Sequence, residues 1–293
     1  MEEVKNRKAN LVKKKKEVFL GGSYLVHPDE LSEIITKMHK IGGNVLQVMI
    51  RDPTKNGKIK KLSESQVIEI RKKLTEYKMK LFIHSPYVIN MAHPFNENGP
   101  SFRSIVAEMD FLSRIADTGC VVHVGKTVGK YTEKEALKNQ VKFITEVVKA
   151  TPNNVSFILE TATGQGTELL YKLKDFTDFF KMLPKEILNR VKICLDTCHI
   201  FAAGNELDPK IFRNRVMKKH LVLIHLNDSL REFGSRIDRH QDFGCGEIPR
   251  KKLEDLTRAA IKLELPMVIE KQSGTMFCKD YKTQIRMVRG LMK

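Results

Sequence analysis

The sequence lacks the apolar segments that membrane insertion or secretion would require. No apolar run approaches the roughly 18 residues of a transmembrane helix. The first 17 residues are rich in lysine and hold no apolar stretch like that of a secretory signal. We therefore expect an intracellular protein, in the cytoplasm or the nucleus and not secreted, with no membrane partner.

Cysteine is scarce, and glycine-rich phosphate loops are missing. The five cysteines are odd in number and scattered, which argues against a disulfide framework. Cys194 and Cys198 have no second pair at zinc-knuckle spacing, so we expect both to be buried thiols. Neither GxGxxG nor GxxxxGK[ST] occurs, which disfavours a doubly wound nucleotide-binding sheet.

Acidic residues are too few to balance the basic ones. The net charge is +17, and residues 1–17 contribute only +4 of it, which leaves +13 on the rest of the chain. A basic body favours a polyanionic partner such as nucleic acid or an anionic membrane. The alternative is a soluble protein that is merely rich in lysine. The lysine run at 13–16 fits a solvated tail, a DNA-tracking arm or a nuclear signal.

Eight short apolar runs alternate with segments of helical period. The expected strands span 18–24, 44–50, 80–86, 120–125, 155–161, 191–197, 221–228 and 266–271. The expected helices span 29–40, 64–77, 101–118, 132–149, 168–182, 209–219, 249–263 and 279–291. Eight strand–helix units predict an α/β fold, a (β/α)₈ TIM barrel over residues 18–293. Residues 1–17 would form a flexible basic extension.

Histidines and carboxylates follow the ends of the last six expected strands. The set is His84, His123, Glu160, Asp196, His199, His225, Asp238, His240 and Glu270. In a TIM barrel all strands end on one face, where active sites are built. Carboxylates that converge there repel one another unless cations neutralise them. Imidazole with carboxylate is a ligand set for zinc, with manganese or iron as alternatives.

Each of these residues also has an ordinary interpretation, because a single acid after a strand is often a helix N-cap, as Asp196 could be. The joint pattern goes further. Three divalent ions against four carboxylates would leave a charge of about +2, which attracts a phosphodiester and activates water for attack.

Five short motifs carry a resemblance to a known family. They are HSPYVIN at 84–90, LETATGQG at 159–166, CLDTCH at 194–199, HLNDS at 225–229 and DRH at 238–240 with GCG at 244–246. Their sequences and order are similar to those of endonuclease IV, from residue 18 to the C-terminus. That family has a TIM barrel fold, in agreement with the strand count.

The resemblance implies three Zn²⁺ ions per chain, with manganese or iron as an alternative at one site. The implied ligand sets are His84, His123 and Glu160 for one ion; Glu160, Asp196, His225 and Glu270 for the second; and His199, Asp238 and His240 for the third. Glu160 and Glu270 are the implied catalytic residues, as ligands first.

The resemblance also implies a reaction and a partner. Endonuclease IV hydrolyses the phosphodiester 5′ to an abasic site in double-stranded DNA, leaving a 3′-hydroxyl and a 5′-deoxyribose phosphate, and many members trim blocked 3′ ends. The implied protein is a monomeric enzyme that acts in base excision repair. Its implied DNA contacts are Tyr87 and Val88 in the minor groove, and Arg51, Arg236, Arg239 and Lys271 at phosphates. The family's intercalating arginine has no clear counterpart at 52–54.

Two other functions remain open. A TIM-barrel sugar isomerase with one or two metals would leave His199, Asp238 and His240 without a role. A non-catalytic nucleic-acid-binding protein would explain the charge but not the inward His and carboxylate set. The lysine-rich composition would suit a large DNA virus or an AT-rich genome.

Overall fold

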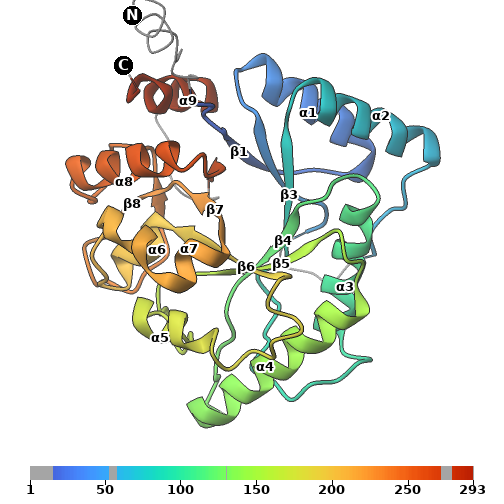
Figure 1. Cartoon of the computed structure of the whole chain (residues 1–293), viewed down its shortest axis with the longest axis vertical. Helices are drawn as coiled ribbons and strands as arrows, with labels where there is room; N and C mark the ends of the chain where they lie inside the picture. Colours follow the sequence, from blue (N-terminus) through green and yellow to red (C-terminus); the bar gives the residue numbers. More distant parts are fainter. Residues whose placement is uncertain (1–15, 53–57, 130, 272–278, 293) are drawn as a thin grey trace, which may run out of the picture.

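A computed structural model describes residues 16–52, 58–129, 131–271 and 279–292. Its centre is a closed barrel of eight parallel strands, each paired with its neighbours, and β1 pairs with both β2 and β10 to close the ring (Figure 1). The strands are β1 (Leu20–Leu25), β2 (Val45–Met49), β3 (Lys80–His84), β4 (Gly119–Val122), β5 (Ser156–Glu160), β6 (Val191–Asp196), β7 (Leu221–His225) and β10 (Met267–Ile269). The predicted TIM barrel is confirmed.

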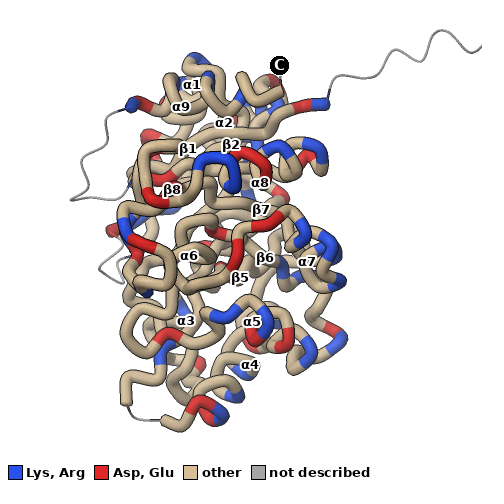
Figure 2. The backbone as a smooth tube through the Cα atoms, turned by 90° about the vertical axis from the view of Figure 1, so that its left-hand side faces the viewer, with Lys and Arg blue, Asp and Glu red and all other residues tan. Residues whose placement is uncertain are grey.

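Helices surround this barrel on the outside (Figure 1). They are α1 (Leu31–Lys40), α2 (Glu64–Glu76), α3 (Pro100–Ser113), α4 (Glu133–Ala150), α5 (Leu173–Phe179), α7 (Arg215–His220), α8 (Arg250–Lys262) and α9 (Tyr281–Gly290). Lysine and arginine recur along them, for example on α7 (Figure 2). Among the described residues, no helix is long and apolar enough to cross a membrane.

Local sequence explains where several helices begin. At α2, Ser63 Oγ accepts from the Gln66 backbone N–H, and the Gln66 side chain accepts from the Ser63 N–H. Thr132 and Glu135 form the same capping box at α4. Each box satisfies two of the backbone N–H groups that the first helical turn leaves unpaired.

Several elements differ from the sequence expectations. The helix expected from residue 168 begins at Leu173, because Glu168 accepts hydrogen bonds from the Gly164 and Gln165 N–H groups and holds the preceding segment as a loop. The strand expected to reach residue 228 ends at His225, and a two-stranded sheet of β8 (Asp228–Ser229) and β9 (His240–Gln241) follows. A short helix, α6 (Thr197–Ala202), was not anticipated. The expected extension at 1–17 lies mostly outside the described residues.

The apolar core has two parts, separated by the strands. The larger packs the helices onto the outside of the barrel, with Phe157 and Phe176 among its fully buried members. The smaller contains one residue from each of seven strands: Val45, Phe82, Val121, Ile158, Cys194, Leu223 and Val268. Successive residues of a strand face opposite sides, so this second group is the apolar filling of the barrel interior.

Glycine is required where β1 pairs with β2. A Cβ on Gly21 would lie 1.6 Å from the backbone oxygen of Val45, which is far inside van der Waals contact. Only glycine lets the backbones of β1 and β2 approach so closely, so Gly21 is a structural residue of this strand pair.

The outer core gives a stability prediction. Phe157→Ala should lower the free energy of unfolding by about 3–5 kcal/mol, because it removes a fully buried ring and leaves a cavity. Phe233→Ala is the control, since Phe233 is 49% exposed and should cost much less. Urea denaturation of the two variants measures both values, and equal losses would contradict this assignment of the core.

Candidate metal centre

Six of the nine predicted ligands occupy the same relative position on six different strands. Each of these six lies two residues after a member of the apolar filling, so its side chain points to the same interior. The pairs are Phe82 and His84, Val121 and His123, Ile158 and Glu160, Cys194 and Asp196, Leu223 and His225, and Val268 and Glu270. The filling therefore forms the floor of a polar site at the carboxyl ends of the strands.

The first group of ligands is formed by His84, His123 and Glu160. His84 Nε2 lies 3.2 Å from Glu160 Oε2, and His123 Nε2 lies 3.0 Å from the same oxygen. Their ligand atoms lie within 4.8 Å of one another, close enough to hold one metal ion.

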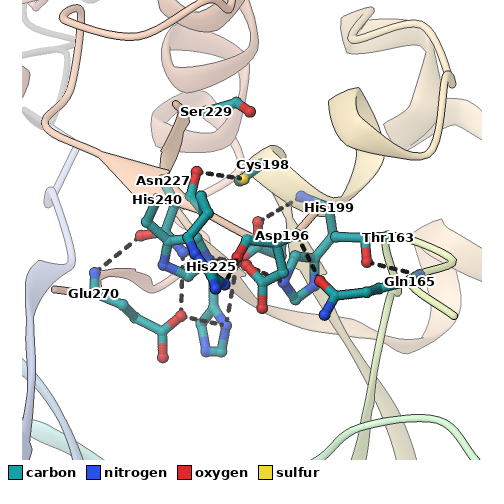
Figure 3. Close-up of polar contacts among 12 residues, drawn as sticks. Thr163, Gln165, Asp196, Cys198, His199, His225, Asn227, Ser229, His240 and Glu270 are labelled. Atoms are coloured by element: carbon teal, nitrogen blue, oxygen red, sulfur yellow. Dashed lines mark hydrogen bonds and ion pairs between the residues drawn. The ribbon is translucent and has the colours of Figure 1, made fainter. Parts of the chain in front are cut away.

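The second group shares Glu160 with the first. His225 Nδ1 lies 2.8 Å from Glu160 Oε1, 3.2 Å from Glu270 Oε2 and 3.7 Å from Asp196 Oδ2. Figure 3 shows His225, Glu270 and Asp196 directed toward one another. The two carboxylate oxygens of Glu160 thus face different histidines, as a bridging carboxylate requires.

The third group comes from α6 and the segment that leads into β9. Asp238 Oδ1 lies 3.4 Å from His199 Nε2 and 3.1 Å from His240 Nε2. His240 Nε2 also lies 3.7 Å from Asp196 Oδ2, which joins the third group to the second. All nine predicted side chains therefore meet in one continuous cluster.

Hydrogen bonds to acceptor groups orient three of the histidine rings. His84 Nδ1 donates to the Ser85 backbone oxygen at 2.8 Å, and His199 Nδ1 donates to the Thr161 backbone oxygen at 2.7 Å. His225 Nε2 donates to Gln47 Oε1 at 2.8 Å. Because these nitrogens are occupied by backbone or amide acceptors, the other nitrogen of each ring is the one directed at the carboxylates and the one available to a metal ion, as in histidines that bind metals.

The charges of the cluster depend on one another. Burial by itself raises the pKa of the Glu160 carboxyl, but His225 and His123 hold that pKa well below its usual range. Burial lowers the pKa of His199, and Asp196 and Asp238 raise it well above its usual range. Without metal, protons on the histidines balance the carboxylates. Metal ions bind neutral imidazole and displace such protons.

The donor set fits divalent metal ions. His199 Nε2 is buried and makes no hydrogen bond to any described residue, although it lies beside Asp238. A buried polar atom in this state normally has a partner, such as an ion. Imidazole nitrogens with carboxylate oxygens are the ligands that zinc takes in catalytic sites.

Asp196 is a helix N-cap, as its ordinary interpretation predicted, and it also belongs to the cluster. Its Oδ1 accepts from the His199 N–H at 2.9 Å and caps α6, while Oδ2 faces the histidines. Cys194 and Cys198 are buried, as expected. Burial raises the pKa of the Cys194 thiol to about 12, so this thiol stays protonated near neutral pH.

Two of the predicted DNA contacts, Tyr87 and Lys271, lie at the mouth of the site. They line a cavity of about 220 Å³ over the cluster, together with Tyr24, Leu25 and Met49. Tyr87 and Val88 are 49% and 46% exposed. The structure does not describe residues 53–57, in the loop after β2 where the family's intercalating arginine has no clear counterpart.

The predicted phosphate contacts have different surroundings. Arg239 is exposed at the mouth. Arg236 donates to the Gly164 backbone oxygen at 2.6 Å and stacks on Tyr171. Arg51 has a side chain only 7% exposed, which pairs with buried Glu108 at 2.9 Å. Glu108 also accepts from Ser85 Oγ, so Arg51 belongs to a buried network next to His84, and its guanidinium is not presented to DNA as the sequence suggested.

Comparison with known proteins identifies the family. The family model described as a xylose isomerase-like TIM barrel matches residues 35–273. A protein of Nitrosopumilus maritimus named as an endonuclease 4 is 30% identical over 240 residues, which cover 78% of this chain and 84% of that protein. The chain belongs to the endonuclease IV family. It is therefore a nuclease, a hydrolase of nucleic acid.

Further relatives agree with this endonuclease IV assignment. An endonuclease 4 of Acanthamoeba polyphaga mimivirus is 28% identical over 244 residues, 78% of each chain. The protein named apurinic-apyrimidinic endonuclease 1 of Plasmodium falciparum is 32% identical over 216 residues, 69% of this chain and 35% of that protein.

Solved structures show how widely the fold is shared. Endonuclease IV of Thermus thermophilus superposes with a TM-score of 0.76 at 18% identity, covering 94% of this chain and 98% of that one. A D-psicose 3-epimerase superposes at 0.61 with 13% identity, covering 92% and 96%. The fold alone therefore does not separate a nuclease from a sugar-converting enzyme, whereas the sequence relatives do.

Metal should stabilise the folded protein. Zinc at about one hundred times its dissociation constant should raise the free energy of unfolding by about 2.7 kcal/mol for each ion bound. Denaturation in zinc and in chelator measures the difference. His240→Ala should reduce it, whereas His39→Ala should not, because His39 stacks on Tyr77 away from the cluster. Identical curves in zinc and in chelator would contradict the metal centre.

Proposed function

We propose that this endonuclease IV family member is a zinc-dependent apurinic/apyrimidinic endonuclease of base excision repair. It cleaves the phosphodiester 5′ to an abasic site in double-stranded DNA, leaves a 3′-hydroxyl and a 5′-deoxyribose phosphate, and trims blocked 3′ ends. The observation that supports this most is the meeting of nine histidine and carboxylate side chains at one barrel mouth. The name of the Plasmodium relative supports the abasic substrate.

Three Zn²⁺ ions per chain would occupy the three ligand groups, with manganese or iron as the alternative at one of them. Bound divalent ions supply positive charge and Lewis acidity for phosphodiester hydrolysis. We assign Glu160 to the bridging position because its two oxygens face different histidines. Glu270 would complete the second group, since its Oε2 lies 3.2 Å from His225 Nδ1.

The chain's own side chains would bind and orient the DNA. Tyr87 lines the cavity over the cluster, Val88 follows it directly, and both side chains are about half exposed, so an aromatic and an aliphatic side chain can enter the minor groove beside a missing base. Arg236, Arg239 and Lys271 would contact phosphates, and the charge of +17 supports electrostatic attraction to the duplex. The missing base lowers the cost of rotating the damaged nucleotide out of the helix.

The third ligand group distinguishes this function from a sugar isomerase. One or two metals would leave His199, Asp238 and His240 unused, although all three contribute to the cluster. We further propose that the protein acts as a monomer inside the cell. The mimivirus relative is consistent with a viral source.

Incision of a defined duplex tests the proposal. The zinc-loaded protein should nick a duplex with one tetrahydrofuran abasic analogue on the 5′ side of the lesion, and a polymerase should extend the 3′ end. Glu160→Gln should lower the rate by a factor of about 10²–10³ or more, because it removes a carboxylate charge shared by two ligand groups.

Glu254→Gln is the matched control, since Glu254 pairs with Arg250 and Arg258 on the surface of α8. It should cut at the wild-type rate. Absence of incision by the zinc-loaded wild type, or equal rates for the two variants, would refute the assignment.

A further inference from the structure

Strands β1 and β2 carry none of the nine ligands, yet both contribute to the interior of the site. Gln47 follows the interior residue Val45 by two positions, so it occupies on β2 the place that a ligand occupies on β3 to β7. Ser23 follows Gly21 in the same way on β1. Gln47 is completely buried.

The amide of Gln47 joins two ligands of the second group. Its Oε1 accepts from His225 Nε2 at 2.8 Å, and its Nε2 donates to Glu270 Oε1 at 2.6 Å. The same nitrogen lies 3.3 Å from Ser23 Oγ. Both ends of a fully buried amide are therefore satisfied by groups of the site.

The orientation of this amide determines which ring nitrogen of His225 is left for a metal ion. With its oxygen toward the ring, Gln47 accepts the hydrogen of Nε2, so Nδ1 is the nitrogen directed at Glu160, Asp196 and Glu270 and the one available to a metal ion. The opposite orientation would place an N–H donor against Nε2 and favour the hydrogen on Nδ1. Glu270 Oε1 prevents that, because it requires a donor where Gln47 Nε2 lies.

A second amide holds the other side of Glu270. Asn227 Nδ2 donates to Glu270 Oε2 at 3.1 Å and to Asp196 Oδ2 at 2.7 Å. Asn227 lies in the short connection after β7, whereas Gln47 lies on β2, which β10 and β1 separate from β7 in the barrel. Each oxygen of Glu270 thus has its own amide donor.

We propose that Gln47 is a positioning residue that prepares His225 and Glu270 to hold the second metal ion. This inference rests on the proposed metal centre. Groups that hydrogen-bond to metal ligands typically change metal affinity by a factor of about 10–100 when they are removed. The sequence Val45-Leu46-Gln47 has the same apolar–x–polar order as Val121-Val122-His123, which supports an equivalent place in the site.

The test compares zinc affinity in the wild type, Gln47→Met and Gln284→Met, without DNA. Methionine keeps the length of glutamine and removes its hydrogen bonds. Gln284 is the matched control because it is also completely buried and bonds to a carboxylate, Asp242, and to the Phe243 N–H, but to none of the nine ligands. Competition with a chromophoric chelator measures each affinity, and the absorption of cobalt-substituted protein reports the ligand geometry.

Gln47→Met should bind one of the ions about 10–100-fold more weakly and change the cobalt spectrum. Gln284→Met should keep the wild-type affinities and spectrum, even if both variants lose similar stability in chelator. Wild-type affinities in Gln47→Met, or equal weakening in Gln284→Met, would overturn the role of Gln47 alone. A wild-type protein that binds no zinc would overturn the metal centre itself, and this inference with it.

Discussion

Four carboxylates buried together at the mouth of a barrel must be balanced by positive charge, and the rest of the site depends on that constraint. Asp196 and Glu160 are almost completely buried, and Asp238 and Glu270 are largely so. Charges in such a place cost several kcal/mol each unless they are paired. Five histidines place imidazole nitrogens around them. Protons can balance the carboxylates in the absence of metal, but divalent ions satisfy carboxylates and imidazoles together.

The regular alternation of side chains along the barrel strands brings these carboxylates and histidines together. Interior positions alternate along each strand, so an apolar residue fills the barrel and the residue two positions later enters the site. Ile158 and Glu160 show the rule on β5, and Leu223 and His225 show it on β7. The apolar filling also keeps water from the underside of the cluster, which strengthens the electrostatic interactions within it.

Much of this arrangement could be predicted from the sequence, because buried parallel strands read as continuous apolar runs and their ends can be located. His84 and Glu270 were placed at the mouth on that basis alone. The sequence could not show which partner each carboxylate oxygen faces. It also missed the short helix α6, whose cap is Asp196, because a helix of six residues has too few turns to show a period. The sequence did not single out Gln47, because glutamine is not among the usual zinc ligands. Its position two residues after Val45 is nevertheless the spacing that the ligands have from the apolar filling.

The DNA interface was harder to predict, because exposed side chains take their roles from tertiary contacts. Arg51 follows β2 at the same rim as the metal ligands, yet Glu108 from α3 draws its guanidinium into the protein. Spacing along the chain contains no information about such a partner. The endonuclease IV family and sugar-converting enzymes share the barrel, so the fold alone does not define the activity.

Anomalous X-ray diffraction at the zinc absorption edge, from crystals of the zinc-loaded protein, tests the central claim most directly. We expect three anomalous peaks within the ring of nine side chains, with Glu160 between two of them. An empty ring, or peaks bound only to surface residues, would contradict the account.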